Sequence, residues 1–205
     1  MHDPGETVEP SRAVPIAVDK PIWSRFFTIA PLVIVGTTEG DGYDLAAKHM
    51  AMPLGWDNYF CFVCSPEHAT QGNAERSGAF TVSFPRPDGI VAASLSASPR
   101  QDDNTKPGLA GIRTFPARVV DGVLVEDSNL WLECELERIV EGFGRNTLIV
   151  GRIVAAAADR DALRRADDDD ADLIFDRPLL AYLSPGRFAS VSESFSFPFH
   201  VNTRI

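Results

Sequence analysis

The 205-residue chain lacks the sequence motifs of several large enzyme classes. It has no GxSxG, no GxxxxGK[ST] and no HExxH, which argues against an α/β-hydrolase, a P-loop nucleotide hydrolase and a zinc protease. Residues 142–144 (GFG) match only the first letters of a dinucleotide-binding fingerprint, and they lie between two predicted strands. We therefore expect no Rossmann fold.

Basic residues are also scarce. Lys and Arg total 19 against 29 Asp and Glu, which gives a net charge of −10 and a pI near 4.8. Nucleic acids and anionic membranes select basic surfaces, so we expect neither as a partner. An anionic ligand would need a local site, where backbone amides and a few cations outweigh the overall negative field.

Long apolar runs and secretion signals are missing as well. The longest apolar stretches, 26–36 and 148–158, fall short of the ~20 residues that cross a bilayer. The first residues, MHDPGETVEPSR, show neither the basic nor the apolar region of a signal peptide. Together with three cysteines, an odd number, this pattern predicts reduced thiols and a cytoplasmic protein.

The residue types that bind metals form no clear metal site. Cys61 and Cys64 have CxxC spacing, but residues three apart on a strand point to opposite faces, so we interpret them as core thiols, like Cys134. The acidic run 167–170 lacks EF-hand spacing and indicates a surface loop. His49 and His68 with an acidic side chain could bind a metal, but we favour the ordinary alternative, in which they contact a ligand or are satisfied by hydrogen bonds within the protein. No metal is predicted.

Residue patterns and turn signals predict mainly β structure. Residues 1–20 form a predicted N-terminal arm and 21–205 one domain. Asp-Gly pairs at 41–42 and 121–122 favour tight hairpins, and 99–116 form a long loop. Alternation along 130–138 places Glu133 on a polar face. Predicted strands are 26–29, 32–38, 43–50, 59–64, 79–84, 118–120, 123–125, 130–138, 146–157, 179–183 and 187–191, and predicted helices are 65–77, 90–98 and 159–166. Many short strands with hairpin turns and only a few short helices indicate an antiparallel barrel.

One segment suits a bound phosphate. Ser65 as N-cap and a proline at the first helical position predict a helix from Ser65 that ends at Gly78. The free N–H groups and the positive end of such a helix attract anions. Ser65, Thr70 and Asn73 add neutral donors, and His68 adds a potential positive charge. An ordinary capped surface helix is the alternative.

A second segment, 44–52, suits a planar ring. Its small side chains Ala46, Ala47 and Ala51 would let a ring system lie against the backbone, whose amides can bond edge heteroatoms. Lys48 is interleaved with these alanines, as are His49 and Met50. An ordinary half-buried strand fits the same pattern.

Taken in order, these segments resemble the flavin reductase-like family, whose fold is an FMN-binding split barrel. The resemblance extends over most of residues 24–190 and implies an antiparallel split β-barrel, a homodimer and FMN bound near the subunit interface. It rests on PLVIVGTT (31–38), DLAAKHMAMPLGW (44–56), FVCSPEHATQGNAERSGAFTVSFP (62–85), NTLIVGRIV (146–154) and PLLAYLSPGRF (178–188).

The resemblance also implies where the cofactor contacts lie. The segment 44–50 would face the isoalloxazine ring, and Ser65, Thr70 and Asn73 would hold the ribityl phosphate. Lys106 and Phe188 match positions near the flavin. The expected cofactor-binding residues are Asp44, Ala46, Ala47, Lys48, His49, Met50, Ala51, Ser65, His68, Thr70, Asn73, Lys106, Asn146 and Phe188, with Trp56 and Arg187 as substrate-side candidates.

Three positions depart from the family pattern. Asp44 stands where many relatives have asparagine, and a carboxylate cannot donate a hydrogen bond unless it is protonated. Asn146 stands where relatives often have a histidine linked to the flavin and nicotinamide site. Met50 stands where some relatives have tryptophan.

The expected function is that of an FMN-dependent oxidoreductase of the flavin reductase type. A reduced nicotinamide, NADH or NADPH, would transfer hydride to the flavin, Lys48 or Lys106 would stabilise negative charge, and no residue would act as a strong acid or base. The alternative is a non-catalytic FMN-binding protein for electron transfer or sensing, which the residues at 44 and 146 favour. A scaffold without flavin is a third reading. The sequence leaves open the electron acceptor, including any partner oxygenase.

Overall fold

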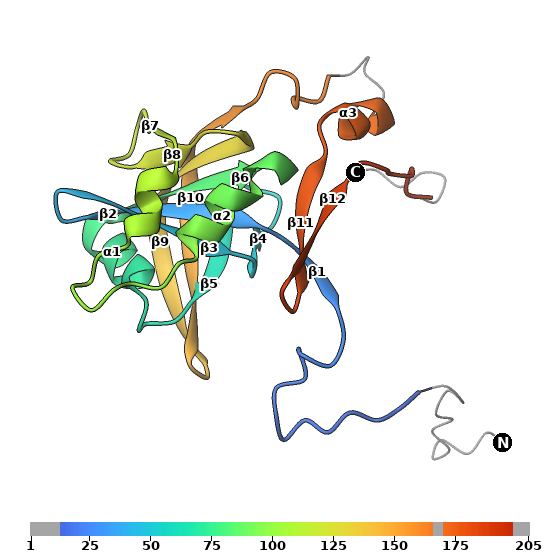
Figure 1. Ribbon diagram of the computed structural model, residues 1–205, viewed down its shortest axis with the longest axis horizontal. Coiled ribbons are helices and arrows are strands. Elements are labelled where there is room, and N and C mark those ends of the chain that lie inside the picture. Colours follow the sequence, from blue (N-terminus) through green and yellow to red (C-terminus); the bar gives the residue numbers. More distant parts are fainter. Residues whose placement is uncertain (1–12, 166–169, 199–205) are drawn as a thin grey trace.

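The computed structural model describes residues 13–165 and 170–198, and within them the chain forms three antiparallel sheets (Figure 1). A seven-stranded sheet has the order β3-β2-β6-β9-β10-β5-β4, a three-stranded sheet the order β1-β11-β12, and β7 pairs with β8. The strands are β1 (Thr28–Pro31), β2 (Val33–Glu39), β3 (Gly42–Lys48), β4 (Ala51–Pro53), β5 (Tyr59–Cys64), β6 (Ala79–Pro85), β7 (Thr114–Pro116), β8 (Val123–Val125), β9 (Ser128–Phe143), β10 (Asn146–Ala158), β11 (Leu179–Ser184) and β12 (Arg187–Val191).

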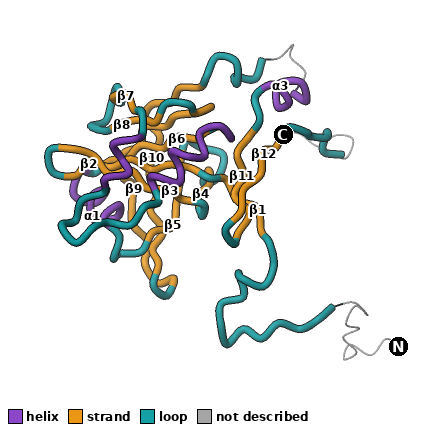
Figure 2. Tube along the Cα trace, viewed as in Figure 1, coloured by secondary structure: helices purple, strands orange, loops and turns teal. Residues whose placement is uncertain are grey.

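The helices are short. They are α1 (Ala69–Ser77), α2 (Ile90–Ser96) and α3 (Asp170–Asp176), with 3₁₀ turns at Pro87–Gly89 and Pro107–Gly111. Figure 2 shows these helices beside a body made mostly of strands. The predicted mainly β, antiparallel split barrel with a few short helices is confirmed. None of the helices in the described ranges is long and apolar enough to span a membrane.

The three-stranded sheet, which we call the tail sheet (β1, β11 and β12), stands beside the main body (Figure 1). The chain passes from β1 into β2 through Leu32, which is buried, so the two sheets are joined covalently as well as by packing. Leu180 and Ala181 of β11 are buried on the body side. Residues 13–20 of the predicted N-terminal arm are exposed and form neither helix nor strand, and residues 1–12 lie outside the described ranges.

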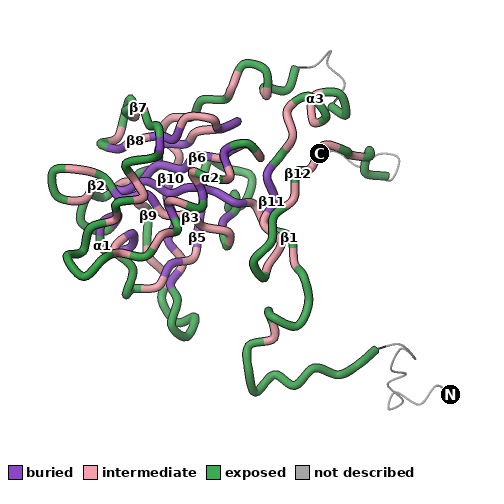
Figure 3. Tube along the Cα trace, viewed as in Figure 1, coloured by how far each residue is buried: buried purple, intermediate pink, exposed green. Residues whose placement is uncertain are grey.

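Two apolar clusters hold the main body together. The larger one lies between β2, β5, β6, β9 and β10, and includes Phe60, Phe62 and Phe80. Phe62 and Phe80 meet edge to face with ring centroids 5.2 Å apart, a favourable aromatic geometry. The smaller cluster joins Ile34 and Leu45 to α2 and the tail sheet. Figure 3 shows the buried segments concentrated in this body.

The cysteines are core thiols, as predicted. Cys61, Cys64 and Cys134 are all free and buried. Burial raises the pKa of the Cys61 thiol, and it raises the pKa of Cys134 to about 12. A thiol with a raised pKa is a poor nucleophile and a poor metal ligand at neutral pH, so Cys61 and Cys134 serve packing.

The hairpin at 121–122 was predicted to pair 118–120 with 123–125, and this pairing is wrong. Residues 118–120 form no strand, and β8 instead pairs with β7, joining Pro116 to Val123. The reason is Glu133, whose buried carboxylate accepts the backbone N–H groups of Arg118, Val119 and Val120 at 2.6–3.1 Å. Those amides bond a carboxylate and are therefore not free for a ladder. Glu133 is thus not a solvent-facing residue, contrary to the alternation.

Burial by itself would raise the pKa of Glu133, but the three backbone N–H groups outweigh burial and hold that pKa below its usual value. The carboxylate is consequently ionised at neutral pH and ties the 118–120 loop to β9.

The helix predicted at 159–166 is also misplaced. Residues 159–165 form turns, in which the Asp159 carboxylate accepts the N–H of Asp161 at 2.9 Å, and such local bonds compete with a helix. Residue 166 and residues 167–169 of the acidic run lie outside the described ranges. The helix is instead α3, whose first turn holds Asp170 and Asp172, where the helix dipole favours negative charge.

Candidate functional site

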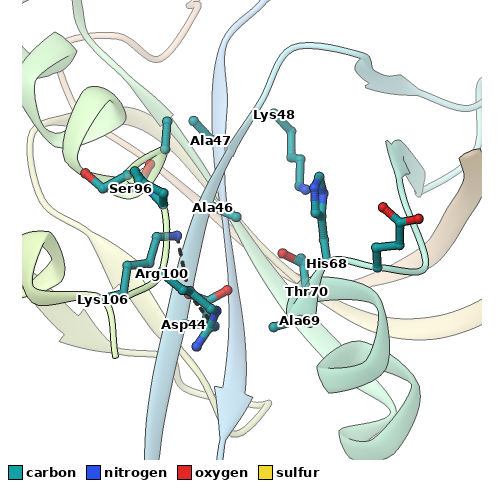
Figure 4. Close-up of a pocket in the computed structure, with 14 residues that line it drawn as sticks. Asp44, Ala46, Ala47, Lys48, His68, Ala69, Thr70, Ser96, Arg100 and Lys106 are labelled. Carbon is teal, nitrogen blue, oxygen red and sulfur yellow. Dashed lines mark hydrogen bonds and ion pairs between the residues drawn. The ribbon is translucent and has the colours of Figure 1, made fainter. Parts of the chain in front are cut away.

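A cavity of about 390 Å³ lies between β3, the start of α1 and the segment that follows α2 (Figure 4). Its volume lies in the range of about 300–1,000 Å³ that is usual for small-molecule sites. Among the expected cofactor-binding residues, the cavity brings together Asp44, Ala46, Ala47, Lys48, His68, Thr70 and Lys106.

The floor of this cavity is β3, which is the outermost strand of the seven-stranded sheet on its side. Side chains alternate along it, so Leu45 enters the smaller core cluster while Ala46 lines the cavity. An outermost strand has backbone N–H and C=O groups without a strand partner on its outer edge. Lys106 Nζ already donates to one of these, the carbonyl oxygen of Leu45, at 2.6 Å. The floor therefore offers small side chains and backbone hydrogen-bonding groups.

Charged side chains gather around Asp44, whose side chain is only 4% exposed. Arg100 Nη2 lies 3.1 Å from Asp44 Oδ1, and Lys106 Nζ lies 3.4 Å from the same oxygen. Arg100 also pairs with Glu39 at 2.9 Å. Two cations thus compensate one buried carboxylate, as a buried charge requires.

Lys106 is held in this cluster as a buried amine. Burial lowers its pKa, Asp44 acts in the opposite direction, and the nearby Arg100 and Lys48 add to the lowering. Its Nζ has both Asp44 and the Leu45 carbonyl as acceptors, which fixes its position on the cavity wall.

The other wall is the first turn of α1, which begins later than predicted. Ser65 caps a preceding turn, in which its hydroxyl accepts the N–H of Glu67 at 3.3 Å and its carbonyl accepts the N–H of His68 at 3.0 Å. The helix therefore starts at Ala69 with His68 as N-cap, and no side chain caps it. Its end at Gly78, in a left-handed conformation with φ of 68°, is as predicted.

An uncapped helix start presents free N–H groups and the positive end of the helix dipole. Ala69 and Thr70 line the cavity at this point. The Thr70 hydroxyl has no hydrogen-bond partner among the described residues, although the residue is buried. This wall therefore carries unused donors that face a cavity.

Lys48 adds a second amine at the cavity. Its Nζ donates to Cys64 Sγ at 3.4 Å and lies 6.0 Å from the centre of the Phe62 ring. No carboxylate in residues 13–165 and 170–198 pairs with it. The described part of the chain therefore places no counter-charge on the Lys48 amine.

Other expected residues near β3 and α1 lie outside the cavity. His49 stacks on Tyr182 of the tail sheet with ring centroids 4.4 Å apart, and burial lowers its pKa. Met50 is exposed, while Ala51 is buried in the larger core cluster. Asn73 Nδ2 donates to Thr37 Oγ1 and to Glu39 Oε1, both at 3.3 Å. The bond to Glu39 helps to hold the carboxylate that pairs with Arg100.

The remaining expected residues lie on other surfaces of the same chain. Ser65 and Asn146 line a neighbouring cavity of about 350 Å³. Arg187 and Phe188 are exposed on β12, and Trp56 is 98% exposed in the turn after β4.

Sequence reasoning missed Arg100 and Glu39. Arg100 lies in the loop 99–116, whose length alone indicated a functional or mobile segment, but nothing in its sequence context pointed to Asp44. Across the described ranges, no group of three or more histidine, cysteine or acidic side chains is arranged to hold a metal ion.

Comparison with known proteins gives one family and several solved structures. The family model described as "Flavin reductase like domain" matches residues 25–189. No curated protein matches the sequence.

Among solved structures, flavoredoxin from Methanosarcina acetivorans is 16% identical with a TM-score of 0.73, covering 92% of this chain and 96% of that one. An FMN-binding protein from Thermus thermophilus with bound p-hydroxybenzaldehyde is 21% identical with a TM-score of 0.72, covering 91% and 99%. BorF, the flavin reductase component of a bacterial two-component tryptophan halogenase, is 20% identical with a TM-score of 0.64, covering 84% and 96%. At these identities the likeness concerns the fold.

Proposed function

The chain belongs to the flavin reductase-like domain family, and on that premise we propose that it is an FMN-binding oxidoreductase that accepts hydride from a reduced nicotinamide. The observation that carries the proposal is the cavity beside β3, because it joins an edge strand of small residues to an uncapped helix start. A flat heteroaromatic ring that ends in a phosphate has complementary chemistry.

The phosphate end is assigned to α1. Free N–H groups at Ala69 and Thr70, the unpartnered Thr70 hydroxyl and the adjacent His68 form a donor set for an anion. Of the three residues expected to hold the phosphate, Thr70 has the most direct support. Asn73 has a supporting role through Glu39 and Arg100, and Ser65 shapes the turn that brings His68 to the cavity.

The ring end is assigned to β3. Ala46 and Ala47 leave the strand accessible, and the amines of Lys48 and Lys106 place positive charge beside it. When bound, FMN supplies the hydride-accepting chemistry, which no side chain of the protein provides. The positive charges of Lys48 and Lys106 would stabilise negative charge on a ligand in the cavity. Asp44 holds Lys106 in place through an ion pair, and Arg100 pairs with the same Asp44 oxygen.

The functional form is assigned as a homodimer. Support comes from apolar side chains that are exposed on and next to the tail sheet: Phe27, Ile29, Leu179 and Phe188. Exposed apolar surface of this kind is typical of subunit contacts. A second copy seated there would also meet the exposed Arg187 of β12.

A partner enzyme that uses the reduced flavin is part of the same proposal. BorF is named as a component of a two-component halogenase, and another neighbour, from Mycobacterium thermoresistibile, is named as nitrilotriacetate monooxygenase component B. A flavin-dependent oxygenase or halogenase is therefore the class of acceptor we expect.

The test of the function is the visible spectrum of the FMN-loaded protein under anaerobic conditions. We expect NADH or NADPH to bleach the bound flavin within seconds to minutes. Bleaching by dithionite but by neither nicotinamide would contradict the reductase assignment and favour an electron-transfer or sensing protein. A protein that takes up no FMN would refute both.

Thr70→Val tests the phosphate assignment. The valine keeps the shape of the side chain and removes the hydroxyl donor. We expect FMN binding to weaken about 10- to 150-fold, because one hydrogen bond to a charged group contributes about 1.5–3 kcal/mol. Riboflavin, which lacks the phosphate, should bind the variant and the parent equally. Ser65→Ala is the comparison, and we expect a smaller effect there. Equal losses for FMN and riboflavin would show that Thr70 contacts another part of the ligand.

A further inference from the structure

Two carboxylates stand on one face of the hairpin that β2 and β3 form beside the cavity. Thr37 of β2 pairs directly with Asp44 of β3, and Glu39 lies two residues beyond Thr37 on the same strand. The side chains of Glu39 and Asp44 therefore point to the same face as diagonal neighbours. Asp44 lines the cavity, whereas Glu39 does not. Any effect of Glu39 on a ligand must therefore pass through other residues.

Arg100 lies between these two carboxylates. Its Nη2 is 2.9 Å from Glu39 Oε1 and 3.1 Å from Asp44 Oδ1, so one nitrogen is shared by both acids. Glu39 is itself held by Asn73, whose Nδ2 donates to Glu39 Oε1 at 3.3 Å. Two neighbouring carboxylates repel each other, and the shared guanidinium offsets that repulsion. Glu39 thereby draws part of the guanidinium away from Asp44.

Lys106 depends on the same oxygen of Asp44. Its Nζ lies 3.4 Å from Asp44 Oδ1, the longer of the two cation contacts that this oxygen makes. Figure 4 shows Asp44, Arg100 and Lys106 gathered on one side of the cavity, apart from Lys48 and His68. The lysine and the arginine therefore compete for one carboxylate.

The backbone brings the two competitors to this carboxylate together. Arg100 and Lys106 stand at the two ends of a loop that is closed by two backbone hydrogen bonds of 2.9 Å within residues 101–105. Arg100 Nη1 also donates to the Asn104 carbonyl at 2.9 Å. A change in the partners of Arg100 is therefore felt by Lys106.

We propose that Glu39 is a positioning residue for the cavity: it restrains Arg100 and thereby fixes the Lys106 amine beside β3. Without Glu39, the guanidinium can take both oxygens of Asp44 in the bidentate geometry that arginine favours. Lys106 would then keep only the carbonyl oxygen of Leu45. The inference rests on the proposed function only in that the ligand beside this amine is a flavin.

The first test measures how fast formaldehyde and cyanoborohydride methylate the Lys106 amine in the full-length protein without added flavin. The chain has three lysines, and Lys20 in the exposed arm is the internal reference. In Glu39→Gln we expect the rate at Lys106, relative to Lys20, to rise about tenfold, the factor that corresponds to one lost hydrogen bond. Mass spectrometry of the peptides locates the modification.

A second substitution separates competition from a general loosening of the loop. Arg100→Met removes the competing guanidinium, so Lys106 should stay on Asp44. In the double variant with Glu39→Gln, the rate at Lys106 should return to within about twofold of the parent, because the two residues act on one another. If Glu39 only anchored the loop, the second loss would not rescue the first.

Glu67→Gln is the matched control for charge. Glu67 lines the same cavity but pairs with Arg145 at 3.3 Å, so its loss should leave the rate at Lys106 unchanged. In the FMN-loaded protein, the loss of a carboxylate favours the reduced flavin anion if charge alone decides. We expect this direction for Glu67→Gln. For Glu39→Gln we expect the opposite, with reduced FMN bound about fivefold more weakly relative to oxidised FMN, because the amine is displaced.

Three results would overturn the proposal. They are a rate at Lys106 in Glu39→Gln equal to that of the parent, equal rates in Glu39→Gln and Arg100→Met without recovery in the double variant, and a shift in the same direction for reduced FMN in Glu39→Gln and Glu67→Gln. The methylation rates are measured without flavin. A parent protein that takes up no FMN would therefore refute the proposed function and leave the positioning role to be decided by those rates.

Discussion

Replacing Ala46 with tryptophan is expected to abolish FMN binding and leave the fold intact. Ala46 is half-buried on the cavity side of β3, an outermost strand, so the indole ring enters the cavity and not the core. It occupies the space over the strand where a flat ring would lie. We expect the dissociation constant for FMN to rise about 100-fold or more, a loss of about 2.7 kcal/mol of binding free energy. Flavin fluorescence quenching on titration measures this.

The matched control is Ala156→Trp, which adds the same ring to an exposed position on β10 that does not line the cavity beside β3. This variant should bind FMN like the parent, and both variants should have the circular dichroism of the parent. Unchanged FMN binding in Ala46→Trp would place the flavin elsewhere. Riboflavin should be lost together with FMN in Ala46→Trp, which distinguishes a blocked ring site from a lost phosphate contact.

Gly151→Ala is expected to give the largest loss of stability from a single added methyl group. Gly151 lies in the centre of β10, and a Cβ there would be 2.4 Å from Phe80 Cζ, 2.6 Å from Phe80 Cε1 and 3.0 Å from Cys134 Cβ. Phe80 is 1% exposed and packs edge to face on Phe62, so its ring cannot move aside freely. We expect the free energy of unfolding to fall by about 1–3 kcal/mol, the usual effect of overpacking a core. The midpoint of urea unfolding measures it.

Gly42→Ala provides the control for the glycine replacement. Its backbone φ is not in the left-handed region, and the nearest atom to an added Cβ is Glu39 O at 3.9 Å. The free energy of unfolding should change by less than about 0.5 kcal/mol. Equal effects of the two substitutions would mean that the Phe80 ring yields, and the core around β10 would then be looser than its contacts indicate.

The charged cluster around Asp44 shows where sequence reasoning reached its limit. The sequence pointed to Lys106 and Asp44 separately, through the family resemblance, and predicted 99–116 to be a long loop, which is usually functional or mobile. It could not show that Arg100 bridges Asp44 and Glu39, because the three residues are brought together by the packing of a loop on an edge strand. Asp44 had been noted as unable to donate like the asparagine of many relatives. In the fold, it is instead the acceptor that positions two cations.

The errors in local structure have the same origin. The start of α1 was predicted from Ser65 as N-cap and Pro66 as first helical residue, but Ser65 bonds its own turn and the helix begins three residues later. The hairpin at 121–122 failed because a carboxylate from β9 takes the amides that a ladder would need. In both cases a local pattern competed with hydrogen bonds that the pattern does not contain.

The sequence by itself determined the class of fold and most of the strands along the chain. Alternating apolar residues, Asp-Gly turns and β-branched runs impose antiparallel pairing locally, and the order of the segments carries the family resemblance. Tertiary structure alone decided which side chains meet. It placed Lys106 on the Leu45 carbonyl, left the Thr70 hydroxyl without a partner among the described residues, and moved Ser65 and Asn146 to a neighbouring cavity. The physical reason is that periodicity sets the face on which a residue lies, whereas long-range packing sets what that face touches.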